Sequence, residues 1–158
     1  PPATRAAQTE SWNGTNWTEV NDLNTGRSNL GGNGIITSAL AYGGYDTEQK
    51  NSTESWNGTN WTDVSSLNTA RYSIGGAGAS SSSAIAFGGT PITAKTEDWN
   101  GASWTEVADM SVTREDIGSG TAGNQTAALV AGGTNPPGVI ATTEEWNGSS
   151  TTTKTVSA

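Results

Sequence analysis

Short stretches of alternating polar and aromatic residues recur along the chain. Residues 9–12 read Thr-Glu-Ser-Trp, an alternation with the period of two that is typical of a β-strand. Asn13-Gly14 follows, a dipeptide that favours a tight turn because both residues tolerate a positive φ. Residues 16–20 then supply a second run, Asn-Trp-Thr-Glu-Val. The pattern predicts a β-hairpin.

The pattern leaves two registers open for this hairpin. A two-residue turn places Trp12 opposite Thr15, whereas a four-residue loop places Trp12 opposite Trp17. In both registers Trp12 and Trp17 share one face with Glu10 and Glu19, because the loop length is even. A buried aromatic side chain removes on the order of 150 to 250 Å² from water. We therefore expect the two indoles to dominate the packing of the unit.

The hairpin sequence repeats along the chain. TESWNGTNWTEV at 9–20 returns as TESWNGTNWTDV at 53–64 and TEDWNGASWTEV at 96–107, and begins again as TEEWNG at 143–148. The first tryptophans are Trp12, Trp56, Trp99 and Trp146, at steps of 44, 43 and 47 residues. A fixed period in this range indicates a repeat architecture.

Two further strands are predicted between successive hairpins, one rich in glycine and one apolar, within residues 30–44, 74–89 and 117–133. Their small residues suit a place where neighbouring sheets converge. Each apolar strand ends in a glycine pair that marks a sharp turn; the pairs are Gly43-Gly44, Gly88-Gly89 and Gly132-Gly133. Loops of unequal length follow, which places the variation between repeats on an exposed rim.

The order of these features resembles the kelch repeat: a double glycine after an apolar strand, then a tryptophan, a Leu-containing turn and an arginine. The resemblance implies a β-propeller with one four-stranded blade per repeat, as in the central domain of galactose oxidase. The repeats are slightly short, and tryptophan stands where the family usually has tyrosine. The wording of residues 9–25 also resembles tandem repeats in structural proteins of tailed bacteriophages.

We therefore expect an all-β, kelch-like β-propeller of about three and a half blades. The expected parts are a connector at 1–8 and a propeller domain at 9–158, with a half blade at 9–20 and blades at 28–64, 72–107 and 115–157. Propellers have about four to eight blades. Further copies in a homo-oligomer, or the remainder of a longer chain, are expected to complete the ring. Three repeats closed as a β-prism are an alternative.

The composition is poor in aliphatic residues but rich in regularly spaced tryptophans. Only 20 of the 158 residues are Leu, Ile, Val or Phe, a fraction typical of disordered chains. Disordered segments are also poor in aromatic residues, whereas this chain has seven tryptophans at regular intervals. The regular spacing favours ordered repeats over disorder.

Charge and residue usage exclude several classes of function. The formal net charge is −8 and the seven basic residues are scattered, so we expect no nucleic-acid partner. The apolar runs are too short for membrane insertion. The chain has no cysteine and no histidine, so we expect no metal site, no cofactor and no catalytic residue. The copper chemistry of galactose oxidase is excluded for the same reason.

Charged residues recur with the repeat. The carboxylates are Glu10, Glu54, Glu97 and Glu144, and the arginines are Arg27, Arg71 and Arg114. A catalytic carboxylate pair is used once in an enzyme, whereas these residues recur, so we expect a structural role. We predict that the arginines donate to a carboxylate or carbonyl between neighbouring blades.

Two functions remain after these exclusions. The first is a non-enzymatic structural or adhesion module of a virion or cell surface, such as a phage tail-fibre or decoration protein, located on the virion or outside the cell. The alternative is a carbohydrate-binding, lectin-like propeller that recognises surface glycans. Its sites would be tryptophans near the hairpin tips, where a flat apolar face beside amide groups suits a sugar ring. The candidate residues are Trp17, Trp61, Trp104, Asn16 and Asn60.

Overall fold

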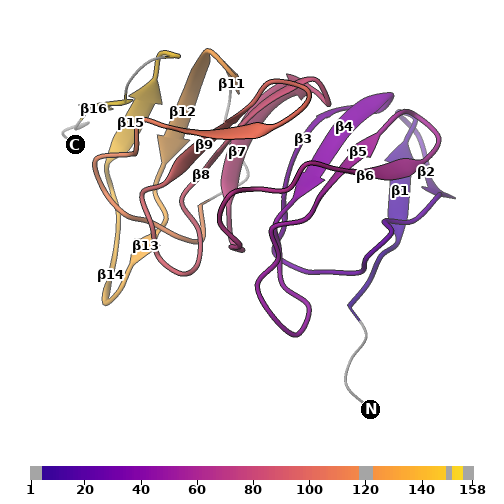
Figure 1. Ribbon diagram of the computed structural model, residues 1–158, viewed down its shortest axis with the longest axis horizontal. Coiled ribbons are helices and arrows are strands. Elements are labelled where there is room, and N and C mark those ends of the chain that lie inside the picture. Colours follow the sequence, from indigo (N-terminus) through magenta and orange to yellow (C-terminus); the bar gives the residue numbers. More distant parts are fainter. Residues whose placement is uncertain (1–4, 118–122, 149–150, 155–158) are drawn as a thin grey trace.

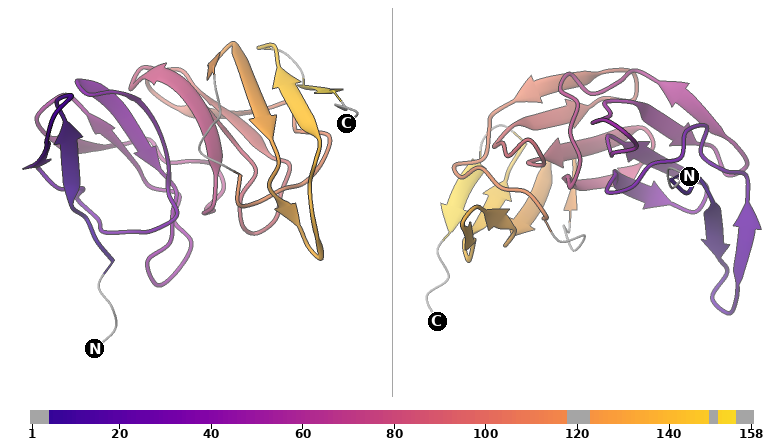
Figure 2. Two further views of the ribbon diagram at one scale, coloured as in Figure 1. Left: turned by 180° about the vertical axis from the view of Figure 1, so that it is seen from behind. Right: turned by 90° about the horizontal axis from the view of Figure 1, so that it is seen from below.

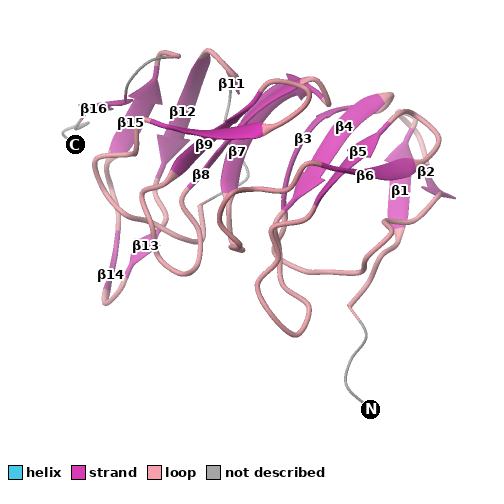
Figure 3. Cartoon of the chain, in the orientation of Figure 1, coloured by secondary structure: helices cyan, strands magenta, loops and turns pink. Residues whose placement is uncertain are grey.

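The computed structural model describes residues 5–117, 123–148 and 151–154, and this part of the chain is all β, without a helix (Figure 3). Four antiparallel sheets, blades 1 to 4, follow one another along the sequence (Figure 1). Blade 1 contains β1 (Thr9–Trp12) and β2 (Trp17–Val20). Blade 2 contains β3 (Gly31–Ile35), β4 (Ser38–Tyr42), β5 (Thr53–Trp56) and β6 (Trp61–Val64). Blade 3 contains β7 (Gly75–Ser80), β8 (Ser83–Phe87), β9 (Thr96–Trp99) and β10 (Trp104–Val107).

Blade 4 is interrupted by a small additional hairpin. Its strands are β11 (Gly123–Asn124), β12 (Ala127–Ala131), β15 (Thr143–Trp146) and β16 (Thr151–Lys154). Between β12 and β15 the chain forms β13 (Thr134–Asn135) and β14 (Gly138–Val139), which pair with each other, and Thr134 also forms an isolated β-bridge with Glu115. This hairpin lies within one of the loops whose length varies between repeats.

The structure settles the register of the repeated hairpin. Trp12 lies opposite Trp17, so the loop has four residues. The side-chain oxygen of Asn13 accepts hydrogen bonds from the backbone N–H groups of Thr15 and Asn16, both at 2.9 Å, and Gly14 adopts a φ of 95°. The Asn-Gly dipeptide therefore closes a four-residue loop rather than a two-residue turn, because the asparagine side chain takes the place of a backbone acceptor.

Each blade has two faces, because side chains alternate across a strand. We call the face with the tryptophans the indole face; in blade 2 it carries Trp56 and Trp61 with Ala39. We call the opposite face the aliphatic face; in blade 2 it carries Leu40 and Tyr42. Both faces of blades 2 and 3 are largely buried.

The hydrophobic cores lie between blades. Leu40 and Tyr42 on the aliphatic face of blade 2 pack in one cluster with Ala84, Trp99 and Trp104 on the indole face of blade 3. The aliphatic face of blade 3 and the indole face of blade 4 form a second cluster of the same kind. A blade thus gains its dry surface from its neighbour, as in other repeat proteins.

The blades form an arc, with the hairpin of blade 1 at one end and β15 and β16 at the other (Figure 2). The innermost strands β3, β7 and β11 lie next to one another, as strands around a propeller axis do. The expected fold class, a partial β-propeller of four-stranded blades, is confirmed, and a prism of three repeats is not formed. No helix long and apolar enough to cross a lipid bilayer occurs among the described residues.

Candidate functional site

Buried ion pairs occupy the junctions between blades. Their side chains are at most 1 % exposed, and the pairs are Arg27–Glu54, Arg71–Glu97 and Arg114–Glu144. Each arginine lies in the connector that leads into a blade, and each glutamate lies in the third strand of that blade. Three of the four carboxylates that recur in the sequence therefore form equivalent buried ion pairs.

Arg71 links blade 2 to blade 3. Its backbone N–H donates to the carbonyl of Lys50 at 3.0 Å, and its own carbonyl accepts from the N–H of Gly44 at 2.9 Å, both in blade 2. Its guanidinium donates to Glu97 Oε1 at 3.0 Å and to the carbonyl of Lys95 at 2.8 Å, both in blade 3. The expected hydrogen bonds from arginine to a carboxylate and a carbonyl are present at this junction.

The glutamate of each pair has further partners. Glu97 Oε2 accepts from the backbone N–H of Asn68 at 2.7 Å and from its side-chain amide at 2.9 Å. Burial lowers the pKa of Arg71, and the neighbouring charge of Glu97 opposes this effect. Apart from the arginine Nε atoms, which have no partner among the described residues, these groups are hydrogen-bonded and closed to solvent, so they are suited to holding blades together. Glu10, the fourth carboxylate of the series, is exposed in blade 1.

The tryptophans proposed as sugar platforms have different environments. Trp104 is 5 % exposed, and its Nε1 donates to Thr53 Oγ1 at 3.0 Å. Trp61 is half-buried, and its Nε1 donates to Thr9 Oγ1 at 3.1 Å. Trp17 is 63 % exposed. Of the three indoles, Trp17 alone presents a broad face to solvent.

The asparagines of the hairpin tips lie on separate blades. Asn60 is exposed, and its side-chain oxygen accepts from Asn21 Nδ2 at 2.7 Å. Asn16 is exposed beside Trp17, whose ring centroid lies 5.4 Å from that of Trp12. The five residues therefore do not form one site. The structure places them one hairpin at a time, with an open indole pair in blade 1.

The first tryptophans of the repeats divide in the same way. Trp56, Trp99 and Trp146 are buried, and their Nε1 groups donate to backbone carbonyls of their own blades. Trp12 is 45 % exposed. Packing within the fold thus explains three of the four first tryptophans. The exception, Trp12, lies in blade 1.

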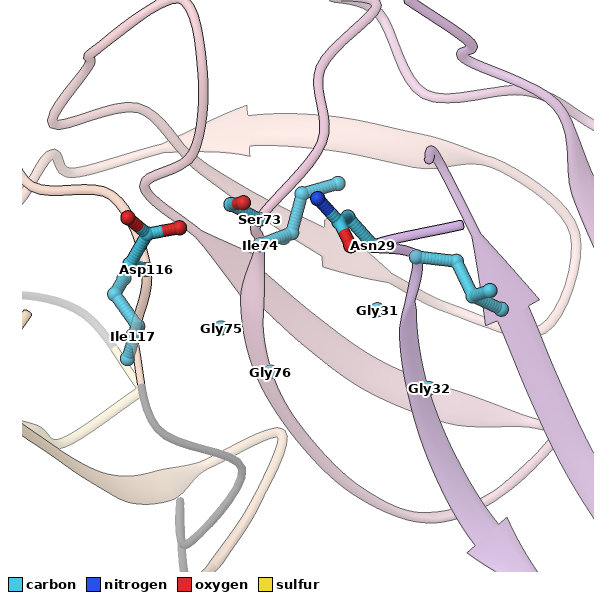
Figure 4. Close-up of a pocket in the computed structure, with 10 residues that line it drawn as sticks. Asn29, Gly31, Gly32, Ser73, Ile74, Gly75, Gly76, Asp116 and Ile117 are labelled. Carbon is cyan, nitrogen blue, oxygen red and sulfur yellow. The ribbon is translucent and has the colours of Figure 1, made fainter. Parts of the chain in front are cut away.

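A pocket of about 310 Å³ lies where the inner strands begin. Its lining comes from equivalent positions in three repeats, namely Asn29 to Gly32, Ser73 to Gly76, and Asp116 with Ile117. Asn29, Ser73 and Asp116 stand at the entrances of the inner strands, and the glycines follow along β3 and β7 (Figure 4). We call this cavity the axial pocket. Glycine is needed at Gly31, Gly75 and Gly76, because a Cβ at any of them would lie within 2.6 Å of the Tyr42 or Phe87 side chain.

The polar residues of the axial pocket share an uncommon backbone conformation. The φ angles of Asn29, Ser73 and Asp116 are 53°, 54° and 51°, a region that costs most non-glycine residues about 1 kcal/mol or more. One contact that holds it is the hydrogen bond from the Ser73 N–H to the Asn29 carbonyl, at 2.8 Å. Such conformations cluster at ligand sites, which makes the axial pocket a candidate functional site.

The chemistry of the axial pocket is that of hydrogen bonding. Its lining offers an amide, a hydroxyl, a carboxylate and glycine backbone, and it contains no basic side chain. This set suits a neutral or cationic ligand with several hydroxyl or amine groups. No group of three potential metal ligands occurs in the part of the chain that the structure describes.

Sequence reasoning did not identify Asn29, Ser73 and Asp116. They lie directly before the aligned Leu-Gly or Ile-Gly pairs of the inner strands, so the repeat alignment contains their position. Their side chains differ in chemistry, however, and form no motif. Alignment by position, instead of by residue type, is the signal that would have found them.

Comparisons with known proteins support the fold. No family model and no curated protein matches the chain. A solved structure titled "Structure of YjhT" is similar, with a TM-score of 0.73 and 11 % sequence identity over 88 % of this chain and 49 % of that one. The chain therefore spans about half the length of that structure. At this identity the likeness concerns the propeller-like fold alone.

Proposed function

We propose that this chain is a non-enzymatic structural module, exposed on the surface of a virion or a cell, which presents loops from a rigid wall of blades. The observation that carries the proposal is the repeated burial of Arg–Glu pairs at three junctions. Three of the four recurring glutamates hold the scaffold together. A frame of blades with variable loops would suit a tail-fibre, decoration or adhesion protein.

The loops that vary between repeats support an adhesive role. The segments 45–52, 90–95 and 134–142 lie along one edge of the arc (Figure 1). The third has its own hairpin, β13–β14, where Val139 is 86 % exposed. An exposed apolar side chain at a loop tip is the kind of feature that contacts a partner.

Surface labelling tests this proposal. Because the chain has no cysteine, Val139→Cys introduces a single thiol at an exposed loop tip, and Ala84→Cys places one in a fully buried position as a control. We expect a membrane-impermeant maleimide to label Val139→Cys on intact particles or intact cells that carry the protein. Ala84→Cys should stay unlabelled until the protein is denatured. Labelling of Val139→Cys only after lysis would reject a surface location.

A lectin-like role is the second candidate, and the axial pocket is the observation that favours it. Asn29, Ser73 and Asp116 offer the donors and acceptors that a polyhydroxylated ligand needs. The exposed Trp17 is a separate platform in blade 1. A fluorescence titration against a glycan panel tests this candidate. Loss of binding in Asp116→Ala would assign the axial pocket, loss in Trp17→Ala the hairpin, and the absence of any saturable signal would reject the candidate.

A further inference from the structure

The two complete contacts between a hairpin tryptophan and the preceding blade follow one rule. Trp61 of blade 2 donates through Nε1 to Thr9 Oγ1 of blade 1, at 3.1 Å. Trp104 of blade 3 donates through Nε1 to Thr53 Oγ1 of blade 2, at 3.0 Å. In both, the tryptophan is the first residue of the second strand of a repeated hairpin. The threonine is the first residue of the corresponding hairpin in the preceding blade. The indole face of one blade thus meets the aliphatic face of its predecessor through a specific hydrogen bond.

At the blade 1 end of the arc, the tryptophan that would donate this hydrogen bond has no neighbouring blade in the described part of the chain. Trp17 is the residue of blade 1 that corresponds to Trp61 and Trp104, and it is 63 % exposed. Its neighbour Trp12 is 45 % exposed, whereas Trp56 is buried. Among the described residues, no sheet covers the indole face of blade 1.

The other end of the arc carries the acceptor half. Leu129 in β12 corresponds to Leu40 and Ile85, as the register with the third strand shows. Leu40 and Ile85 are buried by the next blade, but Leu129 is 46 % exposed. Thr143 begins β15 on the same face, at the position that Thr53 holds in blade 2.

We propose that a second copy of this chain docks head to tail on the arc, with the aliphatic face of its blade 4 against the indole face of blade 1. In this contact Trp17 Nε1 donates to Thr143 Oγ1 of the second copy, and Leu129 of that copy packs against the indoles of Trp12 and Trp17. The same junction then recurs on the other side, so that two chains close a ring.

Three observations favour a second copy over another occupant. The two open faces are the two halves of a contact that the chain already makes with itself, so the interface continues an existing one. Two chains supply six four-stranded blades and two two-stranded ones, within the range of about four to eight blades. One chain also spans 49 % of the similar solved structure, so two copies would match its length. A heterologous contact of this kind forms a closed ring when its rotation permits.

Charge sets the conditions under which the contact forms. Glu10 and Glu19 flank the indoles of blade 1, and Glu145 lies opposite Leu129 on the approaching face. Each copy carries a net charge of −8, so two copies repel each other, and salt screens this repulsion. We expect the dimer to be favoured at high ionic strength and weakened at low ionic strength.

Sedimentation velocity and light scattering of the purified chain test the proposal over a range of protein and salt concentrations. The expected species at high salt has twice the chain mass of 16.1 kDa. Its formation should shift the emission of the exposed tryptophans to shorter wavelength. A monomer at every concentration, or an open series of larger species, would overturn the two-copy ring.

Variants then locate the contact. Leu129→Gln changes an exposed residue of the monomer and should raise the dissociation constant of the dimer at least tenfold. Trp17→Ser should have the same effect. Ile92→Gln, at an exposed position in the middle of the arc, is the matched control and should leave the dimer unchanged. Thermal melts of the monomers at low salt show whether each variant is folded.

Mixing the two interface variants separates a head-to-tail contact from a symmetric one. A dimer of Leu129→Gln with Trp17→Ser has one junction with both native faces, so the mixture should associate more strongly than either variant alone. If instead two blade 1 hairpins met face to face, Leu129→Gln would have no effect. That result would overturn the proposal even if the wild-type protein were a dimer.

Discussion

Removal of the Arg71 guanidinium should cost far more stability than removal of any exposed charge in the same blade. Arg71 Nη2 lies 3.0 Å from Glu97 Oε1, and both side chains are fully buried. In Arg71→Ala the carboxylate of Glu97 keeps its hydrogen bonds to Asn68 but loses its counter-ion. The carbonyl of Lys95 also loses its charged donor.

The magnitude follows from the burial of the pair. Breaking a buried ion pair by removing one partner costs about 3 to 5 kcal/mol, because the remaining charge stays out of water without compensation. For a chain of this length, 1 kcal/mol shifts the melting temperature by about 2 to 4 °C. We therefore expect Arg71→Ala to melt roughly 6 to 20 °C below the wild-type protein.

Lys95→Ala is the matched control. Lys95 Nζ lies 2.9 Å from Glu106 Oε2, but both side chains are more than a third exposed. Exposed pairs contribute about 0 to 1 kcal/mol, so the expected shift is at most about 4 °C. The substitution leaves the backbone carbonyl that Arg71 uses in place. Both variants are compared by circular dichroism melts and by urea unfolding of the tryptophan fluorescence.

A double variant identifies the cause of the loss. Replacement of a whole buried pair by apolar residues is often nearly neutral, so Arg71→Met with Glu97→Leu should recover part of the stability lost in Arg71→Ala; the Lys95 and Gly88 carbonyls and the Asn68 N–H remain without these partners. If Arg71→Ala melts no lower than Lys95→Ala, the pair does not fasten the blades and the reasoning fails. If the double variant melts as low as the single one, the unpaired carboxylate is not the cause.

Three further predictions concern single positions. Tyr42→Phe should remain within about 1 kcal/mol of the wild-type protein at neutral pH, because the Tyr42 hydroxyl is buried without a hydrogen-bond partner and blade 3 uses Phe87 at this position. Burial raises the pKa of Tyr42 above its ordinary value of 10.0, so keeping the phenol neutral costs the folded state free energy as the pH rises above that value. Urea unfolding should therefore show a smaller loss of stability at alkaline pH for Tyr42→Phe than for the wild-type protein. Gly88→Ala should unfold at a lower urea concentration than Gly132→Ala: the φ angles are 65° and 69°, but a Cβ would lie 2.5 Å from a carbonyl oxygen at Gly88 and no closer than 3.8 Å to any neighbour at Gly132. Asn100→Ala should cost about 1 kcal/mol in the same assay, because two backbone N–H groups lose their acceptor; equal unfolding midpoints within the glycine pair, or an unchanged midpoint for Asn100→Ala, would contradict these estimates.

Local pattern was sufficient to predict the strands of the repeat. The motif Thr-Glu-x-Trp occurs four times, as TESW twice, TEDW and TEEW, and each copy forms a strand of four residues. The period of about 44 residues then predicts one sheet per repeat. Both signals lie within a single repeat or in the spacing between repeats, so they require no knowledge of which blades touch.

The loop length of the hairpin could not be predicted from the sequence. A turn of two residues and a loop of four place Trp12 and Trp17 on the same face, so parity cannot separate them. The decision depends on the Asn13 side chain, which accepts two backbone hydrogen bonds in the longer loop. An Asn-Gly pair is compatible with both geometries, and only the structure distinguishes them.

The fate of each indole also depends on distant residues. Trp17 and Trp104 occupy the same position in nearly the same sequence, yet their exposed fractions are 63 % and 5 %. The difference arises from blade 2, whose Thr53 and Tyr42 cover Trp104. Exposure is therefore a property of the neighbouring blade and cannot be read from the repeat itself.

In a chain of near-identical repeats, the position of a copy within the arc decides what its residues do. The same glutamate closes an ion pair with Arg71 in blade 3 as Glu97, and faces solvent in blade 1 as Glu10. The same aliphatic position is covered at Leu40 and open at Leu129. Interior copies satisfy one another, so their conserved spacing describes the scaffold. The unsatisfied copies at the two ends carry the information about partners, because only there does a face built for a contact lack one among the described residues.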